Sequence, residues 1–169
     1  LLVAGNETTR NALSWGMHLL TEHPDQKAAL WNDFETLAPK AAEEIVRWSS
    51  PVIYMRRTAT RDGLRIGDHE FSEGDKVALY YWAANRDPQV FEDPHQFNIF
   101  REAKEHFGYG APGPHFCLGA HLARREITVM LREICRSVPD IQATAPPDRL
   151  LSNFINGIKH LPCTYSFNS

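Results

Sequence analysis

Cys117 combines a reactive side chain with a local sequence suited to presenting it. It ends the glycine- and proline-rich segment 107–117 (FGYGAPGPHFC), and apolar spacing predicts a helix from Leu118 to about Ser137. The free N–H groups at a helix N-terminus stabilise a thiolate, and glycines let the backbone approach a flat ligand closely. A buried, inert cysteine is the alternative at such a position. The loop favours a ligating sulfur.

Two further pairs of residues have the types and spacing that chemistry requires. Glu44 and Arg47 stand at i and i+3, so they share one face of a helix; as an isolated signal this is a surface pair worth about 0.2–0.5 kcal/mol. Glu7 and Thr8 place an acid beside an alcohol in the segment 4–9 (AGNETT), where glycine and β-branched residues weaken a helix. Taken alone, that segment indicates a bent helix with a polar face.

The elements that must position these residues are mainly helical, with small β-sheets. Predicted helices cover residues 1–22, Pro24 to about Glu35, 41–48 after Pro39, and 118–137. Predicted strands cover 52–60 and 64–71, with turns at 62–63 and 67–68, and 77–82 fits a strand or a buried helix. Residues 85–114 show little periodicity, and so long an irregular segment in a compact domain is usually functional.

The composition is that of one ordinary soluble globular domain. The 169 residues are 43% hydrophobic and 23% charged, with a formal net charge of -3, so no basic excess indicates nucleic-acid binding. No apolar run approaches a membrane span, and we expect no membrane anchor in this segment. The three cysteines indicate a reducing compartment. The opening residues LLVAG lack an initiator Met and a charged region, so we expect a fragment of a longer protein rather than a signal peptide.

Taken in order, the three signatures resemble the cytochrome P-450 family of haem-thiolate monooxygenases. Segment 4–8 (AGNET) matches the acid–threonine signature of the family's long central helix, Glu44 and Arg47 match its Glu-x-x-Arg helix, and 113–119 (GPHFCLG) matches its cysteine loop. Segment 85–88 (NRDP) is also common in bacterial members. The resemblance covers residues 1–169, and it implies the C-terminal portion of a single cytochrome P-450 domain whose N-terminal part is absent.

The resemblance also implies how the cofactor, haem b (iron protoporphyrin IX), would be held. Cys117 would be the axial thiolate ligand of the iron, which pushes electron density towards O–O cleavage. His115 and Arg57 would bind the haem propionates, with Arg57 preferred to Arg56 on its spacing to Thr60. The loop glycines that would lie against the cofactor are Gly113 and Gly119.

The two remaining pairs take catalytic and structural roles by the same resemblance. Thr8, with Glu7 beside it, would deliver protons during oxygen activation, and Gly5 would make room for this relay. Glu44 and Arg47 would form a buried ion pair that holds the cysteine loop.

Two positions depart from the family's pattern. The family has Phe seven residues before the cysteine, where this chain has Gly110; a loop with three extra residues, 111–113, accounts for this. Either Phe107 or Tyr109 would then cover the sulfur side of the haem. An arginine upstream of the loop usually joins the Glu–Arg pair. Gln96 stands at that position here, and His95 is the alternative third partner.

The segments that correspond to the family's substrate pocket are largely apolar, which predicts a hydrophobic small-molecule substrate. The lining residues expected from the resemblance are Val52, Ile53, Asn153 and Phe154. Segment 152–162 (SNFINGIKHLP) resembles bacterial members that hydroxylate steroid side chains and branched lipids.

The resemblance implies a cytoplasmic bacterial enzyme that receives two electrons from a ferredoxin-type donor. Basic residues flank the cysteine loop and the following helix, and they are most simply a solvated face. Such a face would suit an acidic partner. Its members are Arg101, Lys104, Arg124, Arg125 and Arg132.

Two other functions remain open at this point. A thiol-dependent hydrolase or transferase would use Cys117 as nucleophile and His115 as base, but a histidine two residues away on a tight loop points poorly for that task. A non-catalytic haem-binding or structural fragment is the second alternative, because the family's pocket needs its missing half. The isolated fragment would then be inactive.

The ligand assignment predicts the result of Cys117→His in the full-length enzyme. Loss of the thiolate should abolish both monooxygenation and the red-shifted Soret band of the ferrous carbonyl complex, because that band depends on a sulfur donor. Absorption spectroscopy of the reduced, carbonylated variant measures this. A retained red-shifted band would show that another residue binds the iron.

Overall fold

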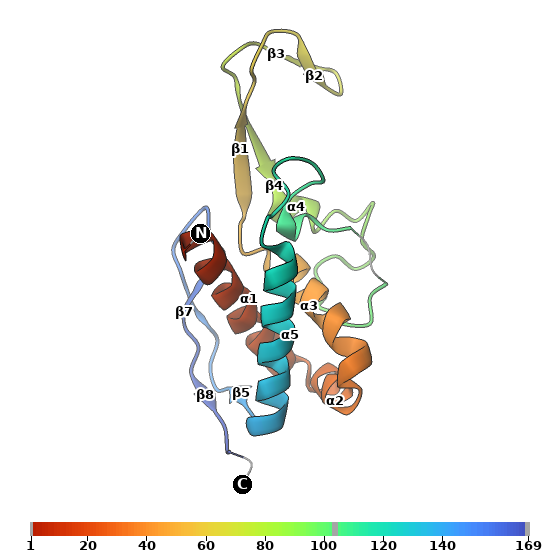
Figure 1. The fold of residues 1–169 in the computed structure, drawn as a ribbon, viewed down its shortest axis with the longest axis vertical. Coiled ribbons are helices and arrows are strands. Elements are labelled where there is room, and N and C mark those ends of the chain that lie inside the picture. Colours follow the sequence, from red (N-terminus) through yellow and green to blue (C-terminus); the bar gives the residue numbers. More distant parts are fainter. Residues whose placement is uncertain (1, 103–104, 168–169) are drawn as a thin grey trace.

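Three long helices, α1 (Leu2–Glu22), α3 (Phe34–Ser49) and α5 (Ala120–Ser137), pack against one another in the computed structural model, which describes residues 2–102 and 105–167 (Figure 1). The shorter α2 (Pro24–Asn32) contacts α1 and α3. Apolar side chains from these helices form the core, where Leu20, Ile45 and Leu131 are completely buried. The predicted mainly α fold is confirmed.

The boundary between α2 and α3 differs from the prediction. The break falls at Asp33, and α3 continues through Pro39 without interruption, whereas the sequence indicated that Pro39 opens a new helix. A proline costs one intrahelical hydrogen bond, to the carbonyl of Glu35. Both residues are exposed, so water can satisfy that carbonyl, and the packed face of α3 holds the helix together.

The described residues also form four small antiparallel sheets of two strands each. Strand β1 (Tyr54–Thr58) pairs with β4 (Lys76–Tyr80), and the hairpin β2 (Leu64–Ile66) and β3 (His69–Phe71) stands at their far end, well away from the helices (Figure 1). A single helical turn, α4 (Tyr81–Ala84), follows β4 directly, so the predicted segment 77–82 is part strand and part helix.

The C-terminal strands lie along α1. Strand β5 (Gln142–Ala143) pairs with β8 (Cys163–Thr164), and β6 (Asp148–Arg149) pairs with β7 (Ile158–His160). Strands β5 and β7 both contact α1. In the part of the chain that is described, no helix is long and apolar enough to cross a membrane.

The irregular segment expected after Asn85 is present. Its described residues up to His106 form no helix or strand, and the first regular turn is the 3-10 helix η1 (Phe107–Tyr109). The cysteine loop then leads into α5 and lies at that helix's N-terminal end, beside α4 (Figure 1).

Candidate functional site

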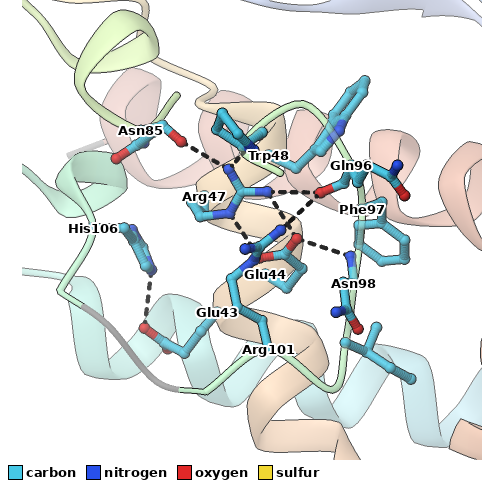
Figure 2. Close-up of polar contacts among 12 residues, drawn as sticks. Glu43, Glu44, Arg47, Trp48, Asn85, Gln96, Phe97, Asn98, Arg101 and His106 are labelled. Atoms are coloured by element: carbon cyan, nitrogen blue, oxygen red, sulfur yellow. Dashed lines mark hydrogen bonds and ion pairs between the residues drawn. The ribbon is translucent and has the colours of Figure 1, made fainter. Parts of the chain in front are cut away.

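Glu44 and Arg47 form an ion pair in the interior of the protein. The guanidinium donates from Nε to Oε2 of Glu44 at 2.7 Å and from Nη2 to Oε1 at 2.8 Å (Figure 2). Both residues are buried, with Arg47 only 1% exposed. Water screens charges little at this depth, and an incompletely paired ion here would be costly.

The remaining N–H groups of Arg47 bind backbone carbonyls of the irregular segment. Nη1 donates to the carbonyls of Asn85 (2.7 Å) and Pro94 (2.8 Å), and Nη2 donates to that of Gln96 (3.0 Å). A guanidinium has five N–H donors, and all of them are therefore used. The ring of Phe91 lies 5.3 Å from the guanidinium carbon. Arg47 thus fixes three points of a segment that has no helix or strand of its own.

Side chains satisfy each of the six successive backbone carbonyls of residues 92–97, which explains how this segment is ordered without secondary structure. The donors are Arg101 for residues 92, 93 and 96, Arg47 for 94 and 96, Trp48 for 95, and Gln26 for 97. Two amides are bound as well: those of Asn98 and Ile99 donate to Glu44 and Gln26 at 2.9 Å.

Arg101 is the third charged member of this cluster. Its Nε lies 3.4 Å from Oε2 of Glu44, and its side chain is only 13% exposed. The expectation that Arg101 lies on a solvated face is therefore wrong. The expected third partners contribute through the backbone instead. The carbonyl of Gln96 accepts from Arg47 and Arg101 (Figure 2). The carbonyl of His95 accepts from Trp48.

Asn85 connects this cluster to the cysteine loop. Its Oδ1 accepts from the amide of Phe107 at 2.6 Å, and its Nδ2 donates to Oγ of Ser50 at 2.9 Å. The loop then lies tightly on α3, because a Cβ added at Gly108 would come within 2.5 Å of Cγ1 of Val46. Only glycine fits at this position without a shift of the chain.

Of the two aromatic residues Phe107 and Tyr109, Tyr109 is the buried one. It is 8% exposed, whereas Phe107 is 37% exposed and stacks on Tyr81. The carbonyl of Tyr109 accepts from the amide of Cys117 at 3.0 Å. The next residue, Gly110, has a φ of 82°, a backbone angle that glycine adopts more readily than other residues do. Which of the two aromatic residues would cover the sulfur side of the haem stays a prediction, and Tyr109 is the one whose backbone binds that of Cys117.

Cys117 lies on the surface among large apolar side chains. Phe116 is 39% exposed and Leu118 is 94% exposed, and the cysteine itself is exposed. Apolar side chains exposed together around one reactive group mark a surface that a ligand covers. An exposed cysteine three residues before α5, flanked in the chain by two exposed apolar side chains, is a donor set that fits haem.

The other residues expected to bind the cofactor are open to contact. His115, Gly113 and Gly119 are all exposed, and a Cβ added at either glycine would meet no atom within 4 Å. Arg57, on β1, donates to the carbonyl of Arg56 at 3.0 Å, and no described carboxylate lies within ion-pair distance of it. Between the side chains of His115 and Cys117 no described hydrogen bond forms, which disfavours a thiol–imidazole nucleophile.

Thr8 and Glu7 lie on α1 but point to different partners. The hydroxyl of Thr8 donates to the carbonyl of Ala4 at 2.7 Å, one turn earlier in the helix. The carboxylate of Glu7 binds Arg10, and this hydrogen bond lowers the pKa of Glu7. The hydroxyl and the carboxylate are therefore not hydrogen-bonded to each other, and the Thr8 hydroxyl satisfies a backbone carbonyl in the weakened stretch of helix.

The two segments that were expected to line a substrate pocket lie side by side, although about a hundred residues separate them in sequence. Val52 forms an antiparallel bridge with Ile155, and the amide of Ile53 donates to the carbonyl of Phe154 at 2.9 Å. Phe154 is 38% exposed and Asn153 is also exposed. The backbones of these two largely apolar segments are therefore adjacent.

A family model for cytochrome P-450 matches residues 1–138, which is most of the chain. The chain belongs to the cytochrome P-450 family. Its helices and small sheets are accordingly a partial cytochrome P-450 fold.

Several characterised members of the cytochrome P-450 family are similar in sequence. A methyl-branched lipid omega-hydroxylase of Mycobacterium tuberculosis is 54% identical over 166 residues, which cover 98% of this chain and 39% of that relative. A steroid C26-monooxygenase of Rhodococcus jostii is 45% identical, over 98% of this chain and 34% of the relative. The chain thus spans somewhat over a third of the length of the curated relatives it matches.

Solved cytochrome P-450 structures share the fold closely. One from Mycobacterium marinum, in complex with pseudoionone, has a TM-score of 0.91 at 42% identity and covers 96% of this chain and 39% of that one. Another, from Bacillus megaterium in complex with corticosterone, has a TM-score of 0.87 at 34% identity, covering 95% and 43%.

The rest of the expected basic face is largely paired. Arg124 binds Glu43, Arg132 binds Glu35 at 3.0 Å, and Arg125 is exposed, whereas Lys104 lies outside the described residues. Sequence reasoning missed the pairing of Arg124, because its partner lies 81 residues earlier and no local spacing signals the contact.

Arg101 gives a direct test of the cluster. We expect Arg101→Ala to lower the free energy of unfolding by about 1–3 kcal/mol, because three carbonyls lose a donor and Glu44 loses a cation. The matched control is Arg125→Ala, an exposed arginine of the same expected face, which should change stability by about 0.5 kcal/mol or less. Urea denaturation of the full-length variants measures both changes. Equal losses of stability would show that Arg101 contributes no more than a solvated arginine does.

Proposed function

We propose that residues 1–169 form the C-terminal part of a single cytochrome P-450 domain, and that the whole protein is a haem-thiolate monooxygenase. The observation that carries the proposal is Cys117, exposed among apolar side chains on a glycine-rich loop at the start of α5. The membership in the family and the buried Glu44–Arg47 pair behind this loop support it.

Haem b would be held by residues of three elements. Cys117 would supply a sulfur ligand to the iron, while Arg57 on β1 and His115 on the loop would bind the propionates. Gly113 and Gly119 leave the backbone accessible where the flat cofactor approaches. When bound, haem supplies the redox chemistry that activates dioxygen. The residues of the chain bind, orient and shield it.

The substrate would be a hydrophobic molecule, and we propose a branched lipid or a steroid. The adjacency of the segments that carry Val52, Ile53 and Phe154 supports an apolar ligand, and exposed Asn153 offers one polar contact. The relatives named for a methyl-branched lipid and for a steroid act on this chemical class.

Electrons would come from a ferredoxin-type donor in the bacterial cytoplasm. Arg125 is exposed on α5 and remains the clearest basic contact for an acidic partner. The pairing of Arg124 and Arg132 with glutamates reduces the net charge of the surface that the sequence indicated.

Thr8 would hold and move a proton during oxygen activation. Its hydroxyl donates to the carbonyl of Ala4 and can also accept a hydrogen bond, for instance from a water molecule. Glu7, bound by Arg10, keeps a lowered pKa and remains ionised at neutral pH. Thr8 is therefore the residue through which a proton would pass, with Glu7 as a charged neighbour.

Replacing Thr8 by Ala tests this function. In the full-length enzyme, we expect Thr8→Ala to keep substrate binding and electron consumption, because neither Cys117 nor the apolar surface changes. Much of the electron flux should appear as hydrogen peroxide, since the proton is no longer delivered in place. Product formed per reducing equivalent and peroxide yield are measured together. If the variant formed as much product per reducing equivalent as the parent, Thr8 would have no role in oxygen activation.

A further inference from the structure

Glu43 precedes Glu44 on α3, but its carboxylate binds a different set of residues. Arg124 on α5 donates from Nε to Oε1 at 2.5 Å and from Nη2 to Oε2 at 3.1 Å. Nε2 of His106 lies 3.1 Å from Oε2, on the side of Glu43 away from Arg47 (Figure 2). Glu43 thus joins α5 to the residues that directly precede η1.

His106 extends this contact into the cysteine loop. Its side chain is only 5% exposed, and its Nδ1 accepts from the amide of Gly108 at 3.0 Å. Because Nδ1 is an acceptor, Nε2 carries the proton and donates to Glu43. His106 therefore links the carboxylate to the glycine that lies against Val46.

Arg124 reaches the same loop from the other side. Its guanidinium carbon lies 4.4 Å from the centre of the Tyr109 ring, and the His106 ring lies 5.6 Å from it. Both partners of Glu43 therefore contact Tyr109, whose carbonyl accepts from the amide of Cys117. A planar cation stacked on an aromatic ring fixes the ring's orientation better than a point charge does.

The charges in this cluster support one another. Burial raises the pKa of Glu43, but the hydrogen bonds of His106 and Arg124 outweigh it and lower that pKa to about 2. The hydrogen bond to Glu43 raises the pKa of Arg124, and the nearby Cys117 adds to this rise. Glu43 is thus fully ionised in the folded protein and balances a cation held close to the thiol.

We propose that Glu43 is a positioning residue for the cysteine ligand: through His106 and Arg124 it fixes Tyr109 and thereby the loop that presents Cys117 to the haem iron. The inference rests on the proposed function, since it needs Cys117 as ligand. Groups behind a metal ligand commonly change its metal affinity by about 10–100-fold when they are removed.

The opposing interpretation is an ordinary ion pair between two helices, and the chain contains a matched example. Glu35 and Arg132 join the same helices, α3 and α5, at 3.0 Å, and Arg132 also lies over an aromatic ring, that of Phe34 at 5.3 Å. This pair has no described contact with the cysteine loop. Glu35→Gln is therefore the control for losing one α3–α5 ion pair.

The experiment compares haem-loaded, full-length Glu43→Gln with Glu35→Gln and the parent. One measurement is the rate at which the red-shifted carbonyl band is lost in urea below the unfolding transition; the other is the midpoint reduction potential. We expect Glu43→Gln to lose the band about tenfold faster than the parent or more. Its potential should shift to more positive values, because the charge of Arg124 is no longer balanced. Glu35→Gln should match the parent in both.

Equal band-loss rates and equal potentials in Glu43→Gln and Glu35→Gln would overturn the inference. A red-shifted carbonyl band in the parent would still support the proposed function in that case. A parent without the red-shifted band would overturn the function and the inference together. Arg124→Lys decides the question if Glu43→Gln does not accumulate. Lysine keeps the charge but cannot make the planar two-point contact with Glu43. If Arg124→Lys lost the carbonyl band only as fast as Glu35→Gln does, the positioning role would be contradicted.

Discussion

The buried guanidinium of Arg47 is the constraint on which the rest of the site depends. A charge that is 1% exposed is tolerated only when its counter-ion and all of its donors are satisfied. The carboxylate of Glu44 satisfies two of the five N–H groups, and three backbone carbonyls must come to the others. Those carbonyls belong to residues 85–96, so this segment has little freedom to lie elsewhere.

A series of hydrogen bonds and packing contacts connects Arg47 to Cys117. Asn85, held by its carbonyl on Arg47, uses its side chain to bind the amide of Phe107. From there η1 lies against α3, and the carbonyl of Tyr109 binds the amide of Cys117. Because α1 packs on α3 as well, the helix that carries Thr8 and the loop that carries Cys117 are both supported by α3.

Helical spacing placed Glu44 and Arg47 on one face of a helix, but by itself it indicated a surface pair, and only the family resemblance implied a buried one. Arg101 could not be found in this way, because its partners are mainly backbone carbonyls, which any sequence provides. The helix boundary was misplaced at Pro39 because the cost of one lost hydrogen bond is small beside the burial of the face of α3. In each case tertiary contacts outweighed the local signal.

Amide hydrogen exchange in Arg47→Lys tests most directly whether this guanidinium holds the loop. Lysine keeps the charge but has three donors in place of five, so some carbonyls must lose their partner. The amides of Phe107 and Cys117 should exchange about tenfold faster or more, because the loop opens locally, while the buried amides of α5 around Leu131 exchange at the parent rate. Unchanged exchange at Phe107 and Cys117, or an equal increase throughout α5, would contradict the dependence of the cysteine loop on Arg47.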